Sequence, residues 1–156
     1  MYMEKEPFYR NNRMSYRLEG DVQRFKSFDE FEQFYSREML DDDTQIGEYL
    51  EDLLIKYDKP ASATSFRAHL AHSYVGNIIN FKKNNPSRDA LISICLALGA
   101  DVEETQYLLK YAGQAPLYVR RRRDVIIWFG LMKHQTIEEV NDKILSHGLK
   151  PLYRED

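Results

Sequence analysis

The chain has 156 residues, of which 43% are hydrophobic, 30% are charged and one is a cysteine, and its formal net charge is −3. This length suits one domain with a single core, and this composition excludes a disordered or collagen-like chain. The lone cysteine excludes an intramolecular disulfide, and the longest apolar run, residues 125–132, is too short to cross a bilayer. We therefore expect a cytoplasmic protein without a membrane partner.

Charge is distributed unevenly along the chain. Residues 1–58 carry 8 Lys and Arg against 15 Asp and Glu, whereas residues 59–124 carry 10 against 5. No acidic residue occurs between Pro60 and Arg88. A basic, acid-free segment is typical of a surface that meets anions, although the net charge by itself argues mildly against a nucleic-acid partner.

Helical patterns follow one another along the chain, and no segment shows the period-2 alternation of a β-strand. We therefore predict an all-α fold. Residues 1–26 show no clear period and are predicted to form an arm. A first helix is predicted over Ser27–Met39, where Ser27 is a suitable cap and four aromatic residues share one face. Further helices are predicted over residues 45–57, 62–68, 72–81 and 87–98.

The C-terminal half contains an internal repeat. Residues 87–118 align without gaps to residues 122–153 at an offset of 35 residues, with ten identical positions. In each copy a capping residue precedes the second helix and a glycine follows it; these residues are Asp101 and Gly113, and Thr136 and Gly148. Each copy is therefore predicted to form a helical hairpin, and the two hairpins are predicted to share a core.

Residues 72–81 have the pattern of a helix that reads DNA. The apolar positions face inward, and the outward positions carry short polar or small residues, namely His72, Ser73, Gly76, Asn77 and Asn80. Asn77 is the best candidate for base readout, because an amide donates and accepts at once, as adenine requires in the major groove. Lys82 and Lys83 follow the helix and suit phosphates, for which charge matters more than geometry.

The run of helices from Ile46 to Leu98, with SYVGNIINFKKNNPSRDALISICLALG at its centre, resembles the Xre/Cro/C1-type helix-turn-helix proteins of bacteria and phages. The resemblance covers about a third of the chain. It implies a lambda-repressor-like bundle of five helices that binds double-stranded DNA as a homodimer, with the third helix in the major groove. It also implies base contacts by His72, Ser73, Gly76 and Asn77 and backbone contacts by Lys82 and Lys83.

The sequence departs from the family pattern around this helix. Ser65 and His69 stand where the family has alanine and a turn glycine. Ala71 stands where a capping serine or threonine is usual, and Phe81 stands where glycine commonly closes the third helix. A left-handed backbone at His69 would cost energy relative to glycine.

Four arginines, residues 120–123, open the first helix of the second repeat copy, where their charge opposes the helix dipole. Such an arrangement indicates an anionic partner, and a solvated connector is the alternative. Because Arg88-Asp89 recurs as Arg123-Asp124, we assign these residues to a structural pair at each helix start. The remaining candidates for phosphate contacts are Arg120, Arg121 and Arg122.

Catalytic and metal-binding motifs are absent from the sequence. It contains no P-loop, no G-x-S-x-G, no Cys/His nucleophile pairing and no H-E-x-x-H. His69 and His72 lie three residues apart without a third ligand nearby, so we predict no metal site. We expect neither an enzyme nor a bound cofactor.

Three segments are predicted: an acidic N-terminal arm with one helix (residues 1–44), a helix-turn-helix bundle (residues 45–99), and a helical extension (residues 100–156) that packs as one unit with the bundle. Two functions remain open. The first is a sequence-specific, DNA-binding transcriptional regulator of bacterial or phage type. The second is a protein-interaction adaptor on a degenerate helix-turn-helix scaffold without sequence-specific DNA binding. The adaptor would hold its partner through the acidic N-terminal segment or the C-terminal hairpins.

Overall fold

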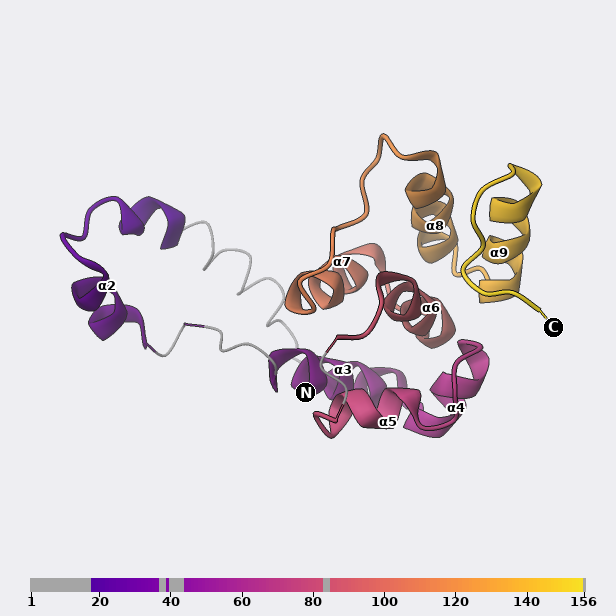
Figure 1. Cartoon of the computed structure of the whole chain (residues 1–156), viewed down its shortest axis with the longest axis horizontal. Coiled ribbons are helices and arrows are strands. Elements are labelled where there is room, and N and C mark those ends of the chain that lie inside the picture. Colours follow the sequence, from indigo (N-terminus) through magenta and orange to yellow (C-terminus); the bar gives the residue numbers. More distant parts are fainter. Residues whose placement is uncertain (1–17, 37–38, 40–43, 83–84, 156) are drawn as a thin grey trace. The chain divides into compact units, whose positions relative to one another are not determined.

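The computed structural model describes residues 18–36, 39, 44–82 and 85–155. The chain divides into two compact units, residues 1–41 (unit 1) and residues 42–156 (unit 2). Every regular element among the described residues is an α-helix (Figure 1), which confirms the predicted all-α class. None of these helices combines the length and the apolar composition that a membrane span requires.

Unit 1 is a cluster of aromatic rings around one helix. Residues 18–22 are helical, and α2 (Phe28–Tyr35) follows them. Ser27 caps α2 as predicted, because its hydroxyl accepts a hydrogen bond of 3.1 Å from the backbone N–H of Glu30. The rings of Phe25, Phe31, Phe34 and Tyr35 pack edge to face or tilted against one another, and Phe25 contacts each of the other three.

Two predictions for this unit differ from the structure. The helix predicted over Ser27–Met39 ends at Tyr35, where its aromatic face also ends, and residues 37–38 lie outside the described residues. The arm predicted for residues 1–26 contains a helix over residues 18–22, which its aperiodic pattern did not indicate. The rest of the arm, residues 1–17, lies outside the described residues.

Unit 2 is built around α6. Its helices are α3 (Thr44–Tyr57), α4 (Ala61–Arg67), α5 (Tyr74–Ile79), α6 (Arg88–Leu98), α7 (Val102–Tyr111), α8 (Arg122–Met132) and α9 (Ile137–Ser146). Helix α6 contacts α3, α4, α7, α8 and α9, and in Figure 1 it lies between α3 and α8. Its side chains supply much of the core, and those of Leu91, Ile92, Ile94 and Cys95 are completely buried.

The predicted start and stop signals are confirmed in both hairpins. Ser87 accepts a hydrogen bond from the N–H of Ala90, and Asp101 and Thr136 each form a complete capping box. Three glycines follow the helices with left-handed backbones: φ is +79° at Gly99, +71° at Gly113 and +70° at Gly148. Glycine adopts this conformation without the steric cost that a Cβ atom would add.

The sequence repeat reappears as two hairpins with the same internal contacts. Helices α6 and α7 form the first hairpin, and α8 and α9 form the second. In the first, the Gln106 side chain accepts from the N–H of Leu117 at 2.7 Å and donates to its carbonyl at 3.0 Å. In the second, Asn141 accepts from the N–H of Leu152 at 2.6 Å and donates to the carbonyl of Tyr153 at 3.2 Å. An amide on the second helix thus holds the exit segment of each hairpin.

The two hairpins exchange their ion pairs. Arg88 of the first hairpin donates two hydrogen bonds, of 3.2 and 3.0 Å, to Asp124 of the second. Arg123 of the second donates two, of 2.9 and 3.0 Å, to Asp89 of the first. The sequence pattern predicts that each arginine pairs with the aspartate next to it in the chain. That pairing is wrong. Adjacent residues point to different sides of a helix, so each arginine meets the aspartate of the other copy.

Each of these arginines also binds the exit of its own hairpin. Arg88 donates to the backbone carbonyls of Ala115 and Pro116, at 2.8 and 3.0 Å. Arg123 donates to the equivalent carbonyls, those of Lys150 and Pro151, at 2.7 and 3.3 Å. One guanidinium therefore closes the loop of its own hairpin and positions the neighbouring hairpin.

A buried carboxylate attaches α7 to α3. The Glu104 side chain accepts hydrogen bonds from the ammonium group of Lys56, from the hydroxyl of Tyr57 and, at 3.0 Å, from the backbone N–H of Asp101. Burial and the hydrogen bond to Glu104 raise the pKa of Tyr57 above its ordinary value. The equivalent residue in the second hairpin, Glu139, is exposed, and its hydrogen bonds with described residues lie within its own capping box.

The exchanged pairs predict unequal effects of two matched substitutions. Asp124→Asn should lower the free energy of unfolding by about 3 kcal/mol, because the Asp124 side chain is only 3% exposed and the change leaves Arg88 partly buried without its counter-charge. Asp89→Asn should cost about 1 kcal/mol, because that side chain is 22% exposed. Urea unfolding followed by circular dichroism measures both values, and equal losses would contradict this role for Asp124.

The position of Cys95 predicts slow reaction with thiol reagents. Its side chain is completely buried, and burial raises the pKa of its thiol to about 12. Native protein at about pH 8 should therefore be alkylated by iodoacetamide far more slowly than protein unfolded in urea, since the reaction requires both opening of the core and a thiolate. Mass spectrometry over time gives the two rates. Similar rates in native and unfolded protein would mean that α6 is not the centre of a stable core.

Candidate nucleic-acid interface

Helices α4 and α5 are joined by a tight turn, residues 68–73. His69 has a left-handed backbone, with φ of +61°, as predicted for this position. The N–H of Leu70 donates to the carbonyl of Ser65 at 3.0 Å, and the N–H of His69 donates to that of Phe66 at 3.1 Å. These bonds satisfy carbonyl groups at the end of α4 and direct the chain back toward α5.

The C-terminal hairpin supports the turn at His69. The imidazole stacks on the ring of Tyr153, with centroids 3.6 Å apart and an interplanar angle of 7°. Its Nε2 atom lies 2.7 Å from a carboxylate oxygen of Glu138, at the start of α9. These contacts offset the cost of a left-handed backbone at a residue other than glycine. The hydrogen bond from His69 also lowers the pKa of Glu138, so this carboxylate stays ionised to lower pH than a free glutamate.

A buried hydrogen bond connects the two helices directly. The Ser65 side chain on α4 is completely buried, and its hydroxyl accepts from the backbone N–H of Val75, in the first turn of α5, at 3.0 Å. The first N–H groups of a helix have no partner within the helix, so Ser65 acts as a cap supplied from another helix. An alanine at position 65 has no hydroxyl and could not accept this hydrogen bond.

The other end of α5 is closed by Phe81 instead of glycine. Phe81 has φ of +61°, and the N–H of Lys82 donates to the carbonyl of Asn77 at 2.8 Å. The Phe81 ring lies over Gly47 of α3, where an added Cβ atom would come within 2.6 Å of the ring and within 2.8 Å of the carbonyl oxygen of Ile78. A glycine at position 47 thus permits the close approach of α3 and α5.

Of the five predicted base-contacting residues, Gly76 and Asn77 lie on α5, and the other three lie in the chain directly before and after it. Val75 and Ile78 are fully buried and anchor the helix on its inward side. The predicted contact residues on the outward side are half-buried at Gly76 and Asn77 and exposed at His72, Ser73 and Asn80. Nδ2 of Asn77 lies 3.5 Å from the hydroxyl of Ser73, which limits the orientation of its amide.

Helix α5 is shorter than the predicted helix over residues 72–81. It spans Tyr74–Ile79, so His72 and Ser73 precede it and Asn80 follows it. The helix ends just before the left-handed backbone at Phe81, and Ser73 stands at its N-cap without a side-chain cap hydrogen bond. Of the two predicted lysine contacts, Lys82 is exposed beside this end, and Lys83 lies outside the described residues.

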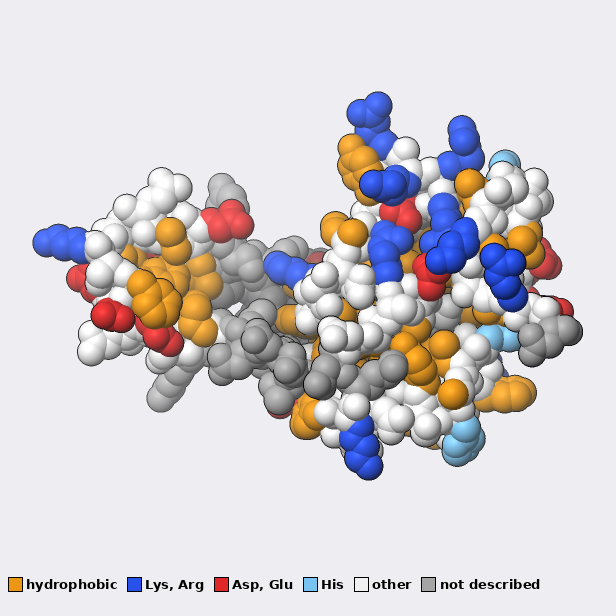
Figure 2. All heavy atoms as spheres, viewed as in Figure 1, with side chains coloured by type: hydrophobic (Ala, Val, Ile, Leu, Met, Phe, Trp, Pro, Cys, Tyr) orange, Lys and Arg blue, Asp and Glu red, His pale blue; other side chains and the backbone are white. Residues whose placement is uncertain are grey.

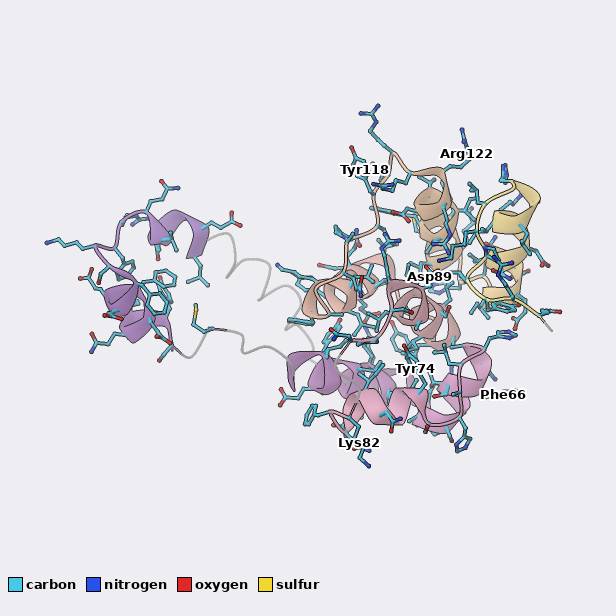
Figure 3. All side chains as sticks on the ribbon, in the orientation of Figure 1. Phe66, Tyr74, Lys82, Asp89, Tyr118 and Arg122 are labelled. Carbon is cyan, nitrogen blue, oxygen red and sulfur yellow. The ribbon has the colours of Figure 1, made fainter. Side chains whose placement is uncertain are left out.

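The predicted arginine contacts lie elsewhere on unit 2. Arg120, Arg121 and Arg122 are exposed at the start of α8, and Figure 3 places Arg122 on the opposite side of the unit from Lys82. Lys and Arg side chains gather on that side, around α8 and the chain leading into it (Figure 2). The structure therefore brings the α5 residues and Lys82 together but does not bring the three arginines to them.

Two residues beside the turn were missed as candidates from the sequence. Phe66 is 80% exposed near the end of α4, and Arg67 is exposed next to it. Both line a cavity of about 460 Å³ between the ends of α4 and α6 and the start of α9, which His69 and His134 also line. The stretch without acidic residues between Pro60 and Arg88 contains Arg67, and this charge pattern could have identified Arg67 as a candidate. Within the described residues, no group of three potential metal ligands occurs in this cavity or elsewhere.

The candidate interface is thus a short helix with a polar outward face, capped by a buried serine and supported at its turn by the C-terminal hairpin. The helix presents amide, hydroxyl and imidazole groups, and a lysine follows it. Comparisons of the chain with models of protein families, with curated proteins and with solved structures find no match.

Proposed function

We propose that unit 2 binds double-stranded DNA through α5 and acts as a sequence-specific transcriptional regulator. The observation that carries the proposal is the buried hydrogen bond from Val75 to Ser65, which fixes α5 against α4 while the outward side of α5 stays polar. In this proposal α3 to α6 belong to a lambda-repressor-like bundle over residues 45–99, and α4 and α5 are its helix-turn-helix.

DNA recognition requires some residues that contact base edges and others that contact phosphates, and both kinds are present around α5. A recognition helix contacts base edges mainly through residues near its N-terminus, where His72 and Ser73 lie. Asn77 is one turn further along, and its amide suits adenine. Lys82 lies just beyond the helix and suits a phosphate, because a flexible cation needs no fixed geometry there.

The surroundings favour an approach from the outward side of α5. The sequence has no acidic residue between Pro60 and Arg88, so no carboxylate of this segment repels phosphates. On the side of the turn, Tyr153 and Glu138 already contact His69. A DNA duplex would therefore meet α5 and Lys82 and leave the turn in contact with the C-terminal hairpin.

The homodimer implied by the family resemblance is part of the proposal. A twofold dimer would present two copies of α5 to half-sites about one helical turn apart, and the selected DNA would then be palindromic. Selection of binders from a random DNA pool with the full chain tests both claims. A palindromic motif supports the dimer, a single half-site indicates a monomer, and the absence of any motif contradicts sequence-specific reading.

Two substitutions separate base reading from charge. Asn77→Ala should weaken binding to the selected sequence by about 1–3 kcal/mol and relax the preference at one base position, because only a base edge requires the amide. Lys82→Ala should weaken binding to all sequences and lower the salt slope by about one, because it removes one phosphate contact. Fluorescence anisotropy titrations at several salt concentrations measure both effects.

Arg122→Ala is the matched control for these titrations. It removes an exposed cation on the opposite side of unit 2 and should leave the affinity and the salt slope unchanged. A lower salt slope for this variant would mean that the arginines bind phosphate, as the sequence predicted. The DNA would then contact a second surface in addition to α5. If no DNA binds in a salt-dependent way, the proposal fails as a whole.

A further inference from the structure

Helix α8 carries an apolar stripe on its outer side. Phe129 and Met132 are each 49% exposed, and Val125 and Ile126 are half-buried. The spacing of these residues, three and four apart, places them on one face of the helix. An exposed apolar face of this kind on a well-packed hairpin marks a contact surface.

The repeat shows what covers the same face in the first hairpin. At the offset of 35 residues, the stripe corresponds to Ala90, Leu91, Ile94 and Ala97 of α6. The first three of these are at most 4% exposed. Helix α6 contacts α3 and α4 in addition to the helices of the two hairpins, whereas the main contacts of α8 are with α6, α7 and α9. Among the described elements, α8 has no counterpart of the two helices that cover α6.

The second helix of each hairpin shows the same difference. Glu104 of α7 is 2% exposed because Lys56 and Tyr57 of α3 bind it. Its equivalent on α9, Glu139, is exposed. The outer face of the second hairpin therefore corresponds to a surface that helices of this chain occupy on the first hairpin.

Arginines border the stripe at the N-terminal end of α8. Arg120, Arg121 and Arg122 are exposed and form no ion pair with any described residue, in contrast to Arg88 and Arg123. A cavity of about 340 Å³ lies between Val119, Arg120, Arg122 and the first apolar residues of the stripe. Tyr118 and Val119, which directly precede these arginines in the chain, are 49% and 59% exposed and extend the apolar surface.

We propose that this outer face of α8 binds an amphipathic helix of another protein, with apolar side chains over Phe129 and Met132 and carboxylates against Arg120, Arg121 and Arg122. Phenylalanine, methionine and arginine are enriched in protein interfaces. The precedent of α3 and α4 on the first hairpin favours a helical partner. The three cations, added to the positive end of the α8 dipole, favour an acidic one.

The apolar stripe distinguishes this partner from DNA. A phosphate backbone would satisfy the arginines but would leave the side chains of Phe129 and Met132 in water. A helix with both apolar and acidic residues covers the whole surface. The proposal gives the predicted adaptor function a definite site in the C-terminal hairpins, and it does not depend on DNA binding by α5.

The test is a selection with the full-length protein from a displayed library of helical peptides of about 20 residues, with one face randomised. Enriched peptides should carry apolar residues at helical spacing, flanked by Asp and Glu. Phe129→Asp should lower the affinity for the best peptide by at least about thirtyfold, because it removes a central apolar contact. Met132→Asp tests a second exposed position independently, and circular dichroism verifies that both variants fold.

Two further measurements complete the test. Replacing Arg120, Arg121 and Arg122 together by alanine should lower the affinity for the peptide by about tenfold or more at low salt and by less at high salt. Ile55→Asp is the matched control, because Ile55 is an apolar residue of α3 that is 69% exposed and lies outside this surface. This substitution should leave the affinity for the peptide unchanged.

Three outcomes would overturn the proposal. The first is that no peptide is enriched relative to a parallel selection on the Phe129→Asp protein. The second is that the best peptide binds the Phe129→Asp and Met132→Asp proteins as well as the native one. The third is that sedimentation equilibrium shows a dimer that both substitutions abolish, which would assign the face to a second copy of this chain.

Discussion

The exchanged ion pairs between the two hairpins determine where the other elements of unit 2 lie. Arg88 with Asp124, and Arg123 with Asp89, join the starts of α6 and α8. Each arginine also holds the exit segment of its own hairpin, so the shape of a hairpin and the position of its neighbour depend on the same side chains. Because Asp124 is nearly fully buried, any other position of α8 would leave a buried charge without its partner.

Both proposed surfaces follow from this position of α8. It brings Glu138 and Tyr153 to His69, and these contacts support the left-handed turn that leads into α5. Among the described helices of unit 2, α3 and α4 pack on α6 and not on the outer stripe of α8. The α5 surface and the α8 surface lie on opposite sides of unit 2 (Figure 3), so DNA and a protein partner would not compete for the same residues.

Local signals could be predicted from the sequence, and contacts between distant segments could not. The all-α class, the helix caps and the left-handed glycines depend on neighbouring residues, and a pattern of few residues reveals them. The repeat was visible, but its alignment does not show that Arg88 meets Asp124, because sequence order suggests the adjacent Asp89. Likewise, Ser65 and Phe81 depart from the helix-turn-helix pattern that the sequence resembles. Only the structure shows that Ser65 caps α5 and that Phe81 closes α5 against α3. The separation of Arg122 from Lys82 depends on the packing of the whole unit.

DNA reading by α5 is tested most directly by an NMR titration of the full chain with a duplex selected from random DNA. The proposed interface predicts that the backbone amide signals that shift belong mainly to residues 70–82, with the largest changes around Asn77, and that the signals of α8 stay in place. Shifts concentrated in Arg120, Arg121, Arg122 and α8, with none in α5, would contradict it.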